Sequence, residues 1–119
     1  MLAGPNHMLA VSDRVVEDFL VISLKGRVDS TNSEELTSIL RGYNNRLARG
    51  LVLNVEDLNY VTSAGFRSLI IAKNETQALS RSFILAGVHS SFKELLDVTG
   101  LTSIFEIYES EHLALTSVN

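Results

Sequence analysis

A serine near the middle of the chain stands where several kinds of chemistry are possible. Residues 56–70 are EDLNYVTSAGFRSLI, in which Ser63 follows an apolar strand and a polar turn and opens an expected helix. Its hydroxyl could accept a backbone N–H as the N-cap of that helix, attack a substrate, or be modified itself. The rest of the chain decides how far each of these possibilities is supported.

The surroundings of Ser63 suit a phosphate group. A helix N-terminus presents unpaired N–H groups and positive partial charge, which favour a dianion. Gly65 removes a side chain two residues on, so the backbone or nucleotide of another protein could approach. Arg67 follows Ser63 by four residues, a spacing that makes side chains neighbours on a helix, so its guanidinium could reach a phosphate. On these residues alone, helix capping and regulatory modification both stay open.

Enzymatic chemistry finds little support in the sequence. Val61 occupies the first position of a G-x-S-x-G nucleophile motif, so Ser63 does not match it. A nucleophile also needs a base oriented by an acid, and neither His89 nor His112 stands in such a pattern. The histidines have no carboxylate pair at ligand spacing, and no glycine-rich phosphate loop occurs. We therefore expect no catalytic residue, no metal site, no cofactor and no enzymatic activity.

The composition is that of one ordinary globular domain. The chain has 119 residues, of which 45% are hydrophobic and 20% charged, and its net charge is −4. The acidic balance argues against nucleic acid as a partner, and no apolar run reaches the roughly 18 residues of a membrane helix, so we expect neither partner. Cysteine is absent, and a small domain without disulfides is typical of the cytoplasm.

The first residues, MLAGPNHM, lack the charged and apolar regions of a signal peptide. His7 and Met8 match what a common cloning site encodes at a start codon. We therefore expect residues 1–7 to be an expression-tag remnant and residues 8–119 to form the domain.

Short segments rich in strand-forming residues predict a sheet. Two strands within Leu9–Leu24 are expected to meet at a turn of Glu17 and Asp18 and to be closed by Gly26. Leu51–Val55 is apolar apart from Asn54, a composition typical of strands buried on both faces. Further strands are expected at Ser82–Ala86 and Ile104–Tyr108.

A first helix is expected between the strand pair and Leu51. Thr31 and Glu34 have the spacing of a capping box, which predicts the helix start. The apolar residues at helical spacing, which we expect to be buried, are Leu36, Ile39, Leu40, Tyr43 and Leu47. Arg46 and Arg49 suit the last turn, and Gly50 would end the helix.

The second half of the chain alternates between helices and strands. A helix is expected over Ala64–Ser80, and a second capping-box spacing, Ser91 with Glu94, opens one that ends at Gly100. Their apolar faces are expected to contain Phe66, Leu69 and Ile70 in the first, and Phe92, Leu95 and Leu96 in the second. A short helix over Ser110–Val118 follows the last strand. Strands separated by helices are joined as parallel neighbours, so the predicted fold is α/β, with a mixed sheet and packed helices.

Several segments together resemble one family. GRVD at 26–29, Thr31 with the following EEL, LVLNVEDLNYVTSAG at 51–65 and FKELLDVTGLTSIFEIYES at 92–110 are similar to the STAS domains of bacterial anti-sigma factor antagonists. The order and spacing agree over essentially all of residues 8–119. The resemblance implies a single STAS domain. It also implies that Ser63 falls on the serine that the partner kinase phosphorylates, Gly65 on the glycine of the same D-S-[ST]-G turn, and Asp29 on an aspartate of the partner-binding surface.

Two residues of the turn depart from the family pattern. Thr62 stands in place of the aspartate before the phosphorylated serine, and Ala64 in place of the second hydroxyl residue. Loss of the carboxylate removes like-charge repulsion on a phosphate, and Thr62 becomes an alternative acceptor. The partner-binding residues expected from the resemblance and the local pattern are Asp29, Thr31, Thr62, Ser63, Ala64, Gly65 and Arg67.

The function implied by the resemblance is an anti-sigma factor antagonist in a partner-switching pathway. Its partners would be an anti-sigma serine kinase of the GHKL type, which it binds while Ser63 is unmodified, and a PP2C-type phosphatase that resets the switch. Two alternatives remain: a STAS module that controls secretion or signalling without a sigma factor, and a STAS domain that binds a small ligand and is never phosphorylated.

Overall fold

The computed structural model describes residues 9–46 and 48–118, with the side chains of Ser90 and Ser91 excepted. Over these residues five strands form one sheet in the order β1-β2-β3-β4-β5. The strands are β1 (Leu9–Val16), β2 (Phe19–Val28), β3 (Gly50–Val61), β4 (Ser82–Ala86) and β5 (Glu106–Tyr108). The helices are α1 (Ser33–Tyr43), α2 (Ser63–Ala78), α3 (Ser90–Thr99), the short 3-10 helix η2 (Leu101–Ser103) and α4 (Glu111–Ser117).

The sheet is mixed, which confirms the predicted α/β class. β1 runs antiparallel to β2, and the neighbouring pairs from β2 to β5 are parallel. The β1–β2 turn is formed by Glu17 and Asp18, with φ of 50° and 70°, the left-handed region that two-residue hairpins require. The expected strand pair is therefore confirmed, and Gly26 closes it opposite Leu9, although β2 itself continues to Val28.

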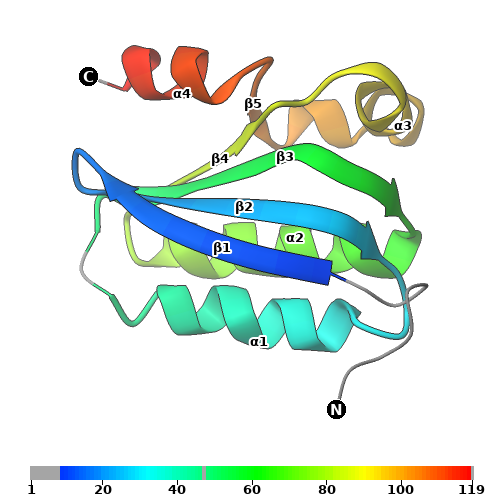
Figure 1. Ribbon diagram of the computed structural model, residues 1–119, viewed down its shortest axis with the longest axis horizontal. Coiled ribbons are helices and arrows are strands. Elements are labelled where there is room, and N and C mark those ends of the chain that lie inside the picture. Colours follow the sequence, from blue (N-terminus) through cyan, green and yellow to red (C-terminus); the bar gives the residue numbers. More distant parts are fainter. Residues whose placement is uncertain (1–8, 47, 119) are drawn as a thin grey trace.

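Helices cover both faces of the sheet to different extents (Figure 1). One face packs on α1, α2 and α3 through a large apolar core; the helical residues of that core are Leu36, Leu40, Phe66, Leu69, Ala72, Phe92 and Leu96. The other face packs on α4 around Ala114. Figure 1 shows α1 and α2 side by side beneath the strands, beginning at the same end of the sheet.

α1 is shorter than its sequence pattern predicts. The helix ends at Tyr43, so Arg46 and Arg49 lie beyond it, and the prediction that they occupy its last turn is wrong. Gly50 is instead the first residue of β3, where a Cβ would lie 2.6 Å from the carbonyl oxygen of Ser82 on the neighbouring strand. Leu47, predicted as part of the buried stripe, lies outside the described residues.

β3 is much longer than the predicted Leu51–Val55, because the polar residues taken for a turn continue the strand. Pairing with β4 stops at Asn54, while pairing with β2 continues to Val61. The second half of β3 therefore has a neighbouring strand on one side only, and polar residues are tolerated there. Two register shifts between β2 and β3 kink this half, as β-bulges do.

The remaining elements lie near their predicted positions, with local exceptions. The last strand, β5, begins at Glu106 and not at the predicted Ile104. β4 has the predicted bounds, and α3 ends at Thr99, followed by the predicted Gly100 as C-cap in the left-handed conformation with φ of 77°. The capping box at Ser91 is wrong in position, because α3 begins at Ser90 after His89 as N-cap. Leu95, predicted to be buried, is 43% exposed.

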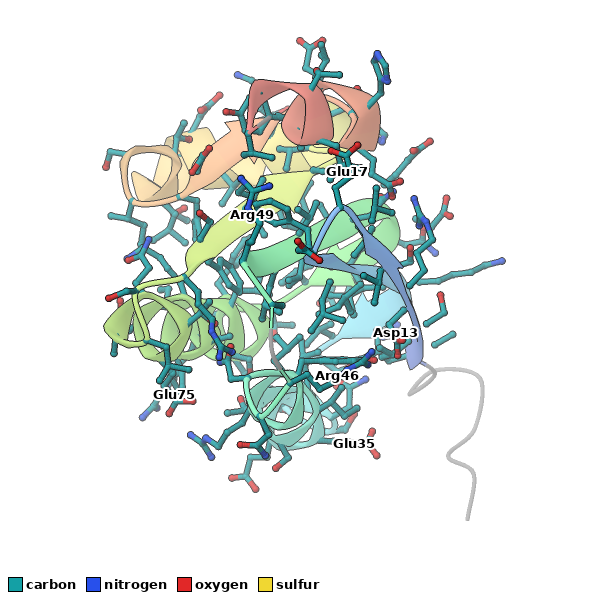
Figure 2. All side chains as sticks on the ribbon, turned by 90° about the vertical axis from the view of Figure 1, so that its left-hand side faces the viewer. Asp13, Glu17, Glu35, Arg46, Arg49 and Glu75 are labelled. Atoms are coloured by element: carbon teal, nitrogen blue, oxygen red, sulfur yellow. The ribbon has the colours of Figure 1, made fainter. Side chains whose placement is uncertain are left out.

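At the end of the sheet that Figure 2 faces, α1 is fastened to the edge strand β1. The Tyr43 hydroxyl donates to Asp13 Oδ2 at 2.6 Å, and Arg46 Nη1 lies 3.5 Å from Asp13 Oδ1. Burial, followed by the hydrogen bond to Asp13, raises the pKa of Tyr43 to about 12. These contacts hold the C-terminal end of α1, far from its start.

Candidate functional site

Two predicted site residues lie at the same edge of the sheet because two parallel strands end together. Val28 is the last residue of β2 and pairs with Val61, the last residue of β3. The N–H of Thr62 donates to the Val28 carbonyl at 3.0 Å, which ties the two following turns to each other. Asp29 and Ser63 therefore follow paired strand ends at the same edge of the sheet, as ligand-binding residues of parallel sheets do.

Ser63 is the first residue of α2, and the N-cap is Thr62. The Thr62 carbonyl accepts the first helical hydrogen bond, from the N–H of Phe66 at 3.0 Å. The interpretation of Ser63 as N-cap is therefore wrong by one residue, because the extended backbone that precedes the helix includes Thr62. Ser63 itself is exposed, so its hydroxyl lies at the surface.

Thr62 differs sharply from its neighbour. Its Oγ1 atom is buried and has no hydrogen-bond partner within the described part of the chain. It makes no capping hydrogen bond to the first turn of α2. A buried hydroxyl cannot reach the active site of another enzyme unless the turn opens, so of the two adjacent hydroxyls Ser63 is the accessible one.

Gly65 is buried, with a role inside the chain. A Cβ at this position would lie 2.8 Å from Val61 Cγ1 and 2.9 Å from Val28 Cγ1. Contacts under 3.0 Å are not tolerated by such short, branched side chains without a shift of the backbone. The glycine therefore lets the first turn of α2 press onto the ends of β2 and β3; its direct contact with a partner stays a prediction.

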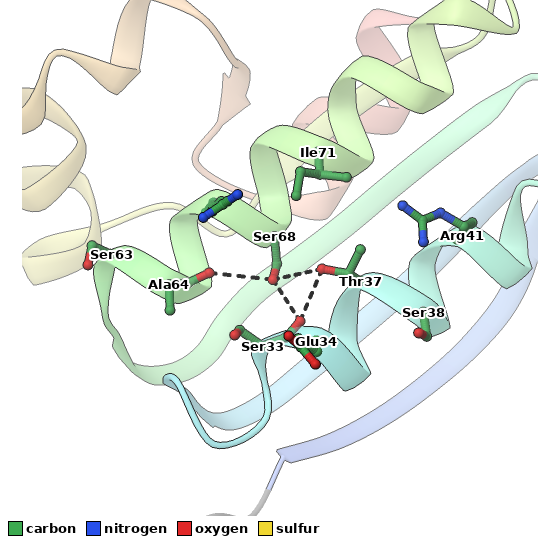
Figure 3. Close-up of a pocket in the computed structure, with 10 residues that line it drawn as sticks. Ser33, Glu34, Thr37, Ser38, Arg41, Ser63, Ala64, Ser68 and Ile71 are labelled. Carbon is green, nitrogen blue, oxygen red and sulfur yellow. Dashed lines mark hydrogen bonds between the residues drawn. The ribbon is translucent and has the colours of Figure 1, made fainter.

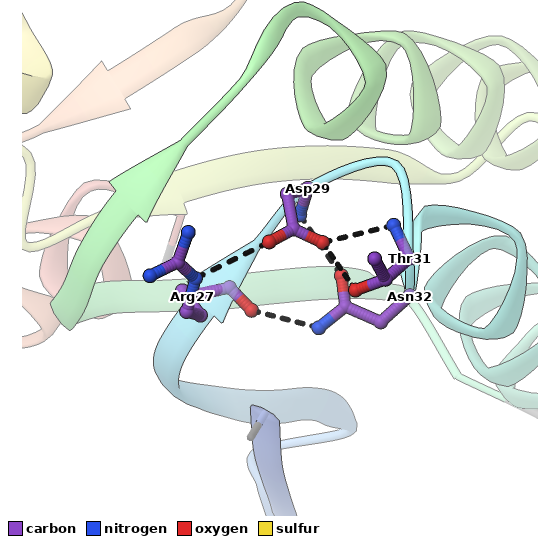
Figure 4. A network of polar contacts seen from close by, with 4 residues as sticks. All are labelled: Arg27, Asp29, Thr31 and Asn32. Atoms are coloured by element: carbon purple, nitrogen blue, oxygen red, sulfur yellow. Dashed lines mark hydrogen bonds and ion pairs between the residues drawn. The ribbon is translucent and has the colours of Figure 1, made fainter. Parts of the chain in front are cut away.

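Asp29 is held in a network of its own turn (Figure 4). Its Oδ1 accepts from the N–H of Thr31 at 2.9 Å and from the Thr31 hydroxyl, and Arg27 Nε donates to its Oδ2 at 3.2 Å. The hydrogen bonds from Thr31, with Arg27 adding to them, hold the pKa of the Asp29 carboxyl below its usual range. Only 9% of Asp29 is exposed.

Thr31 is engaged by Asp29, so the predicted capping box with Glu34 is wrong. α1 begins at Ser33 with Asn32 as N-cap. The Asn32 side chain points back toward β2, where its Oδ1 accepts from the N–H of Asp29 and its Nδ2 donates to the Arg27 carbonyl, both at 2.9 Å. The asparagine thus closes the turn between β2 and α1.

Three site residues were not found by sequence reasoning: Arg27, Asn32 and Tyr60. The Arg27 guanidinium lies 4.5 Å over the ring of Tyr60, which is 50% exposed. Arg27 and Tyr60 are paired across β2 and β3 only after the second register shift. Gly26, with φ of 112°, stands at this shift, and a glycine inside a strand often marks a bulge. The glycine does not indicate which residues the bulge brings together, so the pair could not be read from the sequence.

A groove runs between α1 and α2 from their first turns onward (Figure 3) and has a volume of about 720 Å³. Its lining comprises Ser33, Glu34, Thr37, Ser38, Arg41, Ser63, Ala64, Arg67, Ser68 and Ile71. At its floor, the buried Ser68 hydroxyl donates to the Ser33 carbonyl at 2.7 Å and accepts from the Thr37 hydroxyl at 2.9 Å.

The structure therefore divides the predicted site into two adjoining parts. Ser63, Ala64 and Arg67 line the groove, whereas Asp29 and Thr31 belong to the network beside it. No group of three His, Cys, Asp or Glu suited to a metal ion occurs among residues 9–46 and 48–118. Over the same residues, no helix is both long and apolar enough to span a membrane.

Comparison with known proteins agrees with this architecture. Residues 10–114 match the family model of the STAS domain. The chain belongs to the STAS domain family. Among curated relatives, BtrV of Bordetella bronchiseptica, which carries the name of an anti-sigma factor antagonist, is 26% identical over 99 residues, covering 83% of this chain and 85% of BtrV.

Solved structures share the fold at low sequence identity. An anti-sigma factor antagonist from Mycobacterium paratuberculosis has a TM-score of 0.84 at 18% identity, covering 99% of this chain and 98% of that one. The phosphorylated form of SpoIIAA from Bacillus has a TM-score of 0.69 at 18% identity, covering 94% and 100%. A sulfate transporter family protein from Wolinella succinogenes has a TM-score of 0.76 at 13% identity, covering 87% of each chain.

Proposed function

We propose that this STAS domain is an anti-sigma factor antagonist that acts by partner switching and has no catalytic activity of its own. The name of the relative BtrV supports the proposal, as does the shared fold with SpoIIAA, whose structures include phosphorylated and unphosphorylated forms. Its partner would be an anti-sigma serine kinase of the GHKL type, in the cytoplasm, and a PP2C-type phosphatase would reverse the modification.

The observation that carries the proposal is the exposed hydroxyl of Ser63 at the start of α2. The adjacent Thr62 hydroxyl is buried, which favours Ser63 over Thr62 as phosphate acceptor. The first turn of α2 contains no acidic residue, so a phosphate there meets no carboxylate of its own helix. It also meets the positive end of the helix dipole.

In the proposed cycle the unmodified chain docks onto the kinase and displaces the sigma factor. The docking surface comprises Asp29, Thr31, Ser63, Ala64 and Arg67, with Thr62 and Gly65 shaping the turn from beneath. The Ser63 oxygen then attacks the γ-phosphorus of ATP, the bond to the β–γ bridging oxygen breaks, and ADP leaves with that electron pair. A base of the kinase accepts the hydroxyl proton, and the phosphatase later hydrolyses the phosphoserine.

Phosphorylation would separate the partners by electrostatics. The phosphate adds about −1.5 to −2 charges at neutral pH. Within the complex it would face a nucleotide pocket that already holds phosphates, and like charges brought together in an interface cost several kcal/mol. Since each 1.4 kcal/mol is about tenfold in affinity, we expect Ser63→Glu to weaken kinase binding on the order of a hundredfold.

The test is capture of partners from cells on wild type, Ser63→Ala and Ser63→Glu, followed by calorimetry with the captured kinase and by mass spectrometry of Ser63 after incubation with ATP. Ser63→Ala should bind persistently, because it cannot be phosphorylated. Its free energy of unfolding should change by less than about 0.5 kcal/mol, since Ser63 is not the N-cap. Gln77→Glu adds one negative charge at the far end of α2 and serves as the control.

The outcomes distinguish the possibilities. A kinase that also binds a sigma factor supports the proposal, whereas a kinase with another target would assign the chain to secretion or signalling control. Binding of Ser63→Glu as tight as wild type, with the fold intact, would refute the phosphorylation switch. Phosphate found on Thr62 instead of Ser63 would refute the assignment of the acceptor.

A further inference from the structure

Arg67 is an exposed cation beside the proposed acceptor, and no ion pair or hydrogen bond engages it within the described part of the chain. The other arginine of the same groove is different. Arg41 is held by Glu75 through two hydrogen bonds, of 2.9 Å from Nε and 2.7 Å from Nη2. The groove therefore contains one neutralised guanidinium and one that is available to an anion.

Ser63 and Arg67 are placed to meet. They lie one helical turn apart on α2, a spacing that brings side chains together, and both line the groove. A planar guanidinium can donate two parallel N–H groups to phosphate oxygens. The order of the two charges along the helix is favourable as well. The phosphate would lie at the positive N-terminal end of α2, and Arg67 lies one turn closer to the C-terminus.

We infer that the phosphoryl group on Ser63 is bound by Arg67 of the same chain, so that Arg67 acts as an internal latch for the modified state. The inference rests on the proposed function only in taking Ser63 as the residue that is modified. It assigns Arg67 to the released, phosphorylated protein, in addition to its expected place in the docking surface.

The other charged groups around the groove do not replace Arg67. Glu34 lines the opposite wall from α1 and would repel the phosphate, and Arg41 is already paired with Glu75. Asp29, beside the groove, is an anion engaged by Thr31 and Arg27. Of the charged residues that line the groove, Arg67 is thus the one that can meet the added charge without breaking an existing ion pair.

The latch has a consequence for the switch. Repulsion between the phosphate and the nucleotide pocket destabilises the complex. The ion pair with Arg67 would in addition stabilise the free, phosphorylated protein. Release from the kinase is then favoured from both sides of the equilibrium. Replacement of Arg67 should weaken the switch even where the kinase interface is unaffected.

The test installs phosphoserine at position 63 during translation and so needs no kinase. Phosphorus NMR titrates the phosphate in the wild-type background, in Arg67→Met and in Lys73→Met. Lys73 is on the same helix and its loss changes the net charge equally, but it lies about 15 Å from Ser63 along the helix axis, whereas Arg67 lies about 6 Å from it. Free phosphoserine has a second pKa of about 6. Arg67→Met should raise the phosphate pKa by about half a unit relative to wild type, and Lys73→Met by far less.

Arg67→Lys keeps the charge without the planar fork and should give an intermediate shift. In 1 M salt the difference between wild type and Arg67→Met should largely vanish, as for an exposed ion pair. Equal titrations for Arg67→Met and Lys73→Met, with both proteins folded by NMR, would overturn the latch. That result would leave the kinase binding of unmodified Ser63 untouched, so the latch and the proposed function fail separately.

Discussion

The starts of α1 and α2 lie at the same end of the sheet, each after one of two paired parallel strands, yet they differ in their hydrogen bonds and in their charge. At the start of α1 the Asn32 side chain closes the turn with two hydrogen bonds, and Glu34 and Glu35 place negative charge in the first turn. At the start of α2 the Thr62 hydroxyl makes no hydrogen bond within the described residues, and the first turn contains no acid.

The two helix starts differ in whether negative charge offsets the positive end of the helix dipole. Carboxylates in a first turn offset the positive end of the helix dipole, so α1 has its negative charge permanently. α2 has none, and the exposed Ser63 is where negative charge could be added. The start of α2 thus lacks the two features that α1 has, namely carboxylates in the first turn and a hydrogen-bonded N-cap side chain. The following substitutions test this contrast.

The largest effect is expected at the two N-cap residues. Asn32→Ala would leave the N–H of Asp29 and the carbonyl of Arg27 without their partners in a buried turn, so it should lower the free energy of unfolding by about 2–3 kcal/mol. Thr62→Val removes a buried hydroxyl that has no partner among the described residues, so stability should be unchanged or rise by up to about 1 kcal/mol.

Urea denaturation followed by circular dichroism measures both variants. A loss for Thr62→Val as large as that for Asn32→Ala would show that the Thr62 hydroxyl is bonded in solution. The two N-cap side chains would then not differ in their hydrogen bonding.

The next effect concerns two glycines, one in each helix. Gly65→Ala forces a methyl group against Val28 and Val61, and should destabilise the fold by about 1–2 kcal/mol after the better helix propensity of alanine is counted. Gly42, in α1, has nothing within 4 Å of the position of a Cβ. Gly42→Ala should therefore stabilise by about 0.5 kcal/mol.

Thermal unfolding of the two alanine variants gives the sign directly. If Gly65→Ala were as well tolerated as Gly42→Ala, the first turn of α2 would not be pressed onto the strands as described.

The smallest effect is a difference in acid. Because the folded-state pKa of Asp29 is lowered, its carboxylate stabilises the fold above its unfolded pKa of about 3.9, and this contribution is lost as the pH falls through the folded pKa. Wild type should thus be more stable than Asp29→Asn at pH 7, and the gap should close in acid, below about pH 4. Glu34→Gln removes a carboxylate from the same helix start and is the control.

Denaturant midpoints at pH 7, 5 and 3 for the three proteins decide the matter. A gap between wild type and Asp29→Asn that stays constant down to pH 3 would mean that the ionised carboxylate is not what the turn binds.

Much of the fold could be predicted, because it is encoded locally. β4, apolar from Phe83 to Ala86, and the C-cap glycine of α3 are set by composition and by backbone conformation within a few residues, and the sequence predicts both correctly. The parallel arrangement followed from the alternation of strands and helices. The position of Ser63 at a helix start was also predicted, together with the closeness of Asp29 that the family resemblance implied.

What could not be predicted depends on pairing between distant residues. The polar half of β3 resembled a turn because it has a neighbouring strand on one side only, and its bulged register alone brings Arg27 to Tyr60. The capping box at Thr31 failed because Asp29, two residues earlier, takes both of its donors. The spacing of a capping box is a local sequence signal, and it fails where the turn before the helix engages the same side chain.

The antiparallel register of β1 has a practical consequence for experiments on this chain. Leu9 pairs with Gly26, so the described chain begins beside Arg27 and Asp29, whereas the Glu17–Asp18 turn lies at the opposite end of the sheet. A fluorophore or immobilisation handle attached at Leu9 would therefore lie next to the surface under study. The Glu17–Asp18 turn, remote and exposed, is the better place for a reporter that must leave the switch undisturbed.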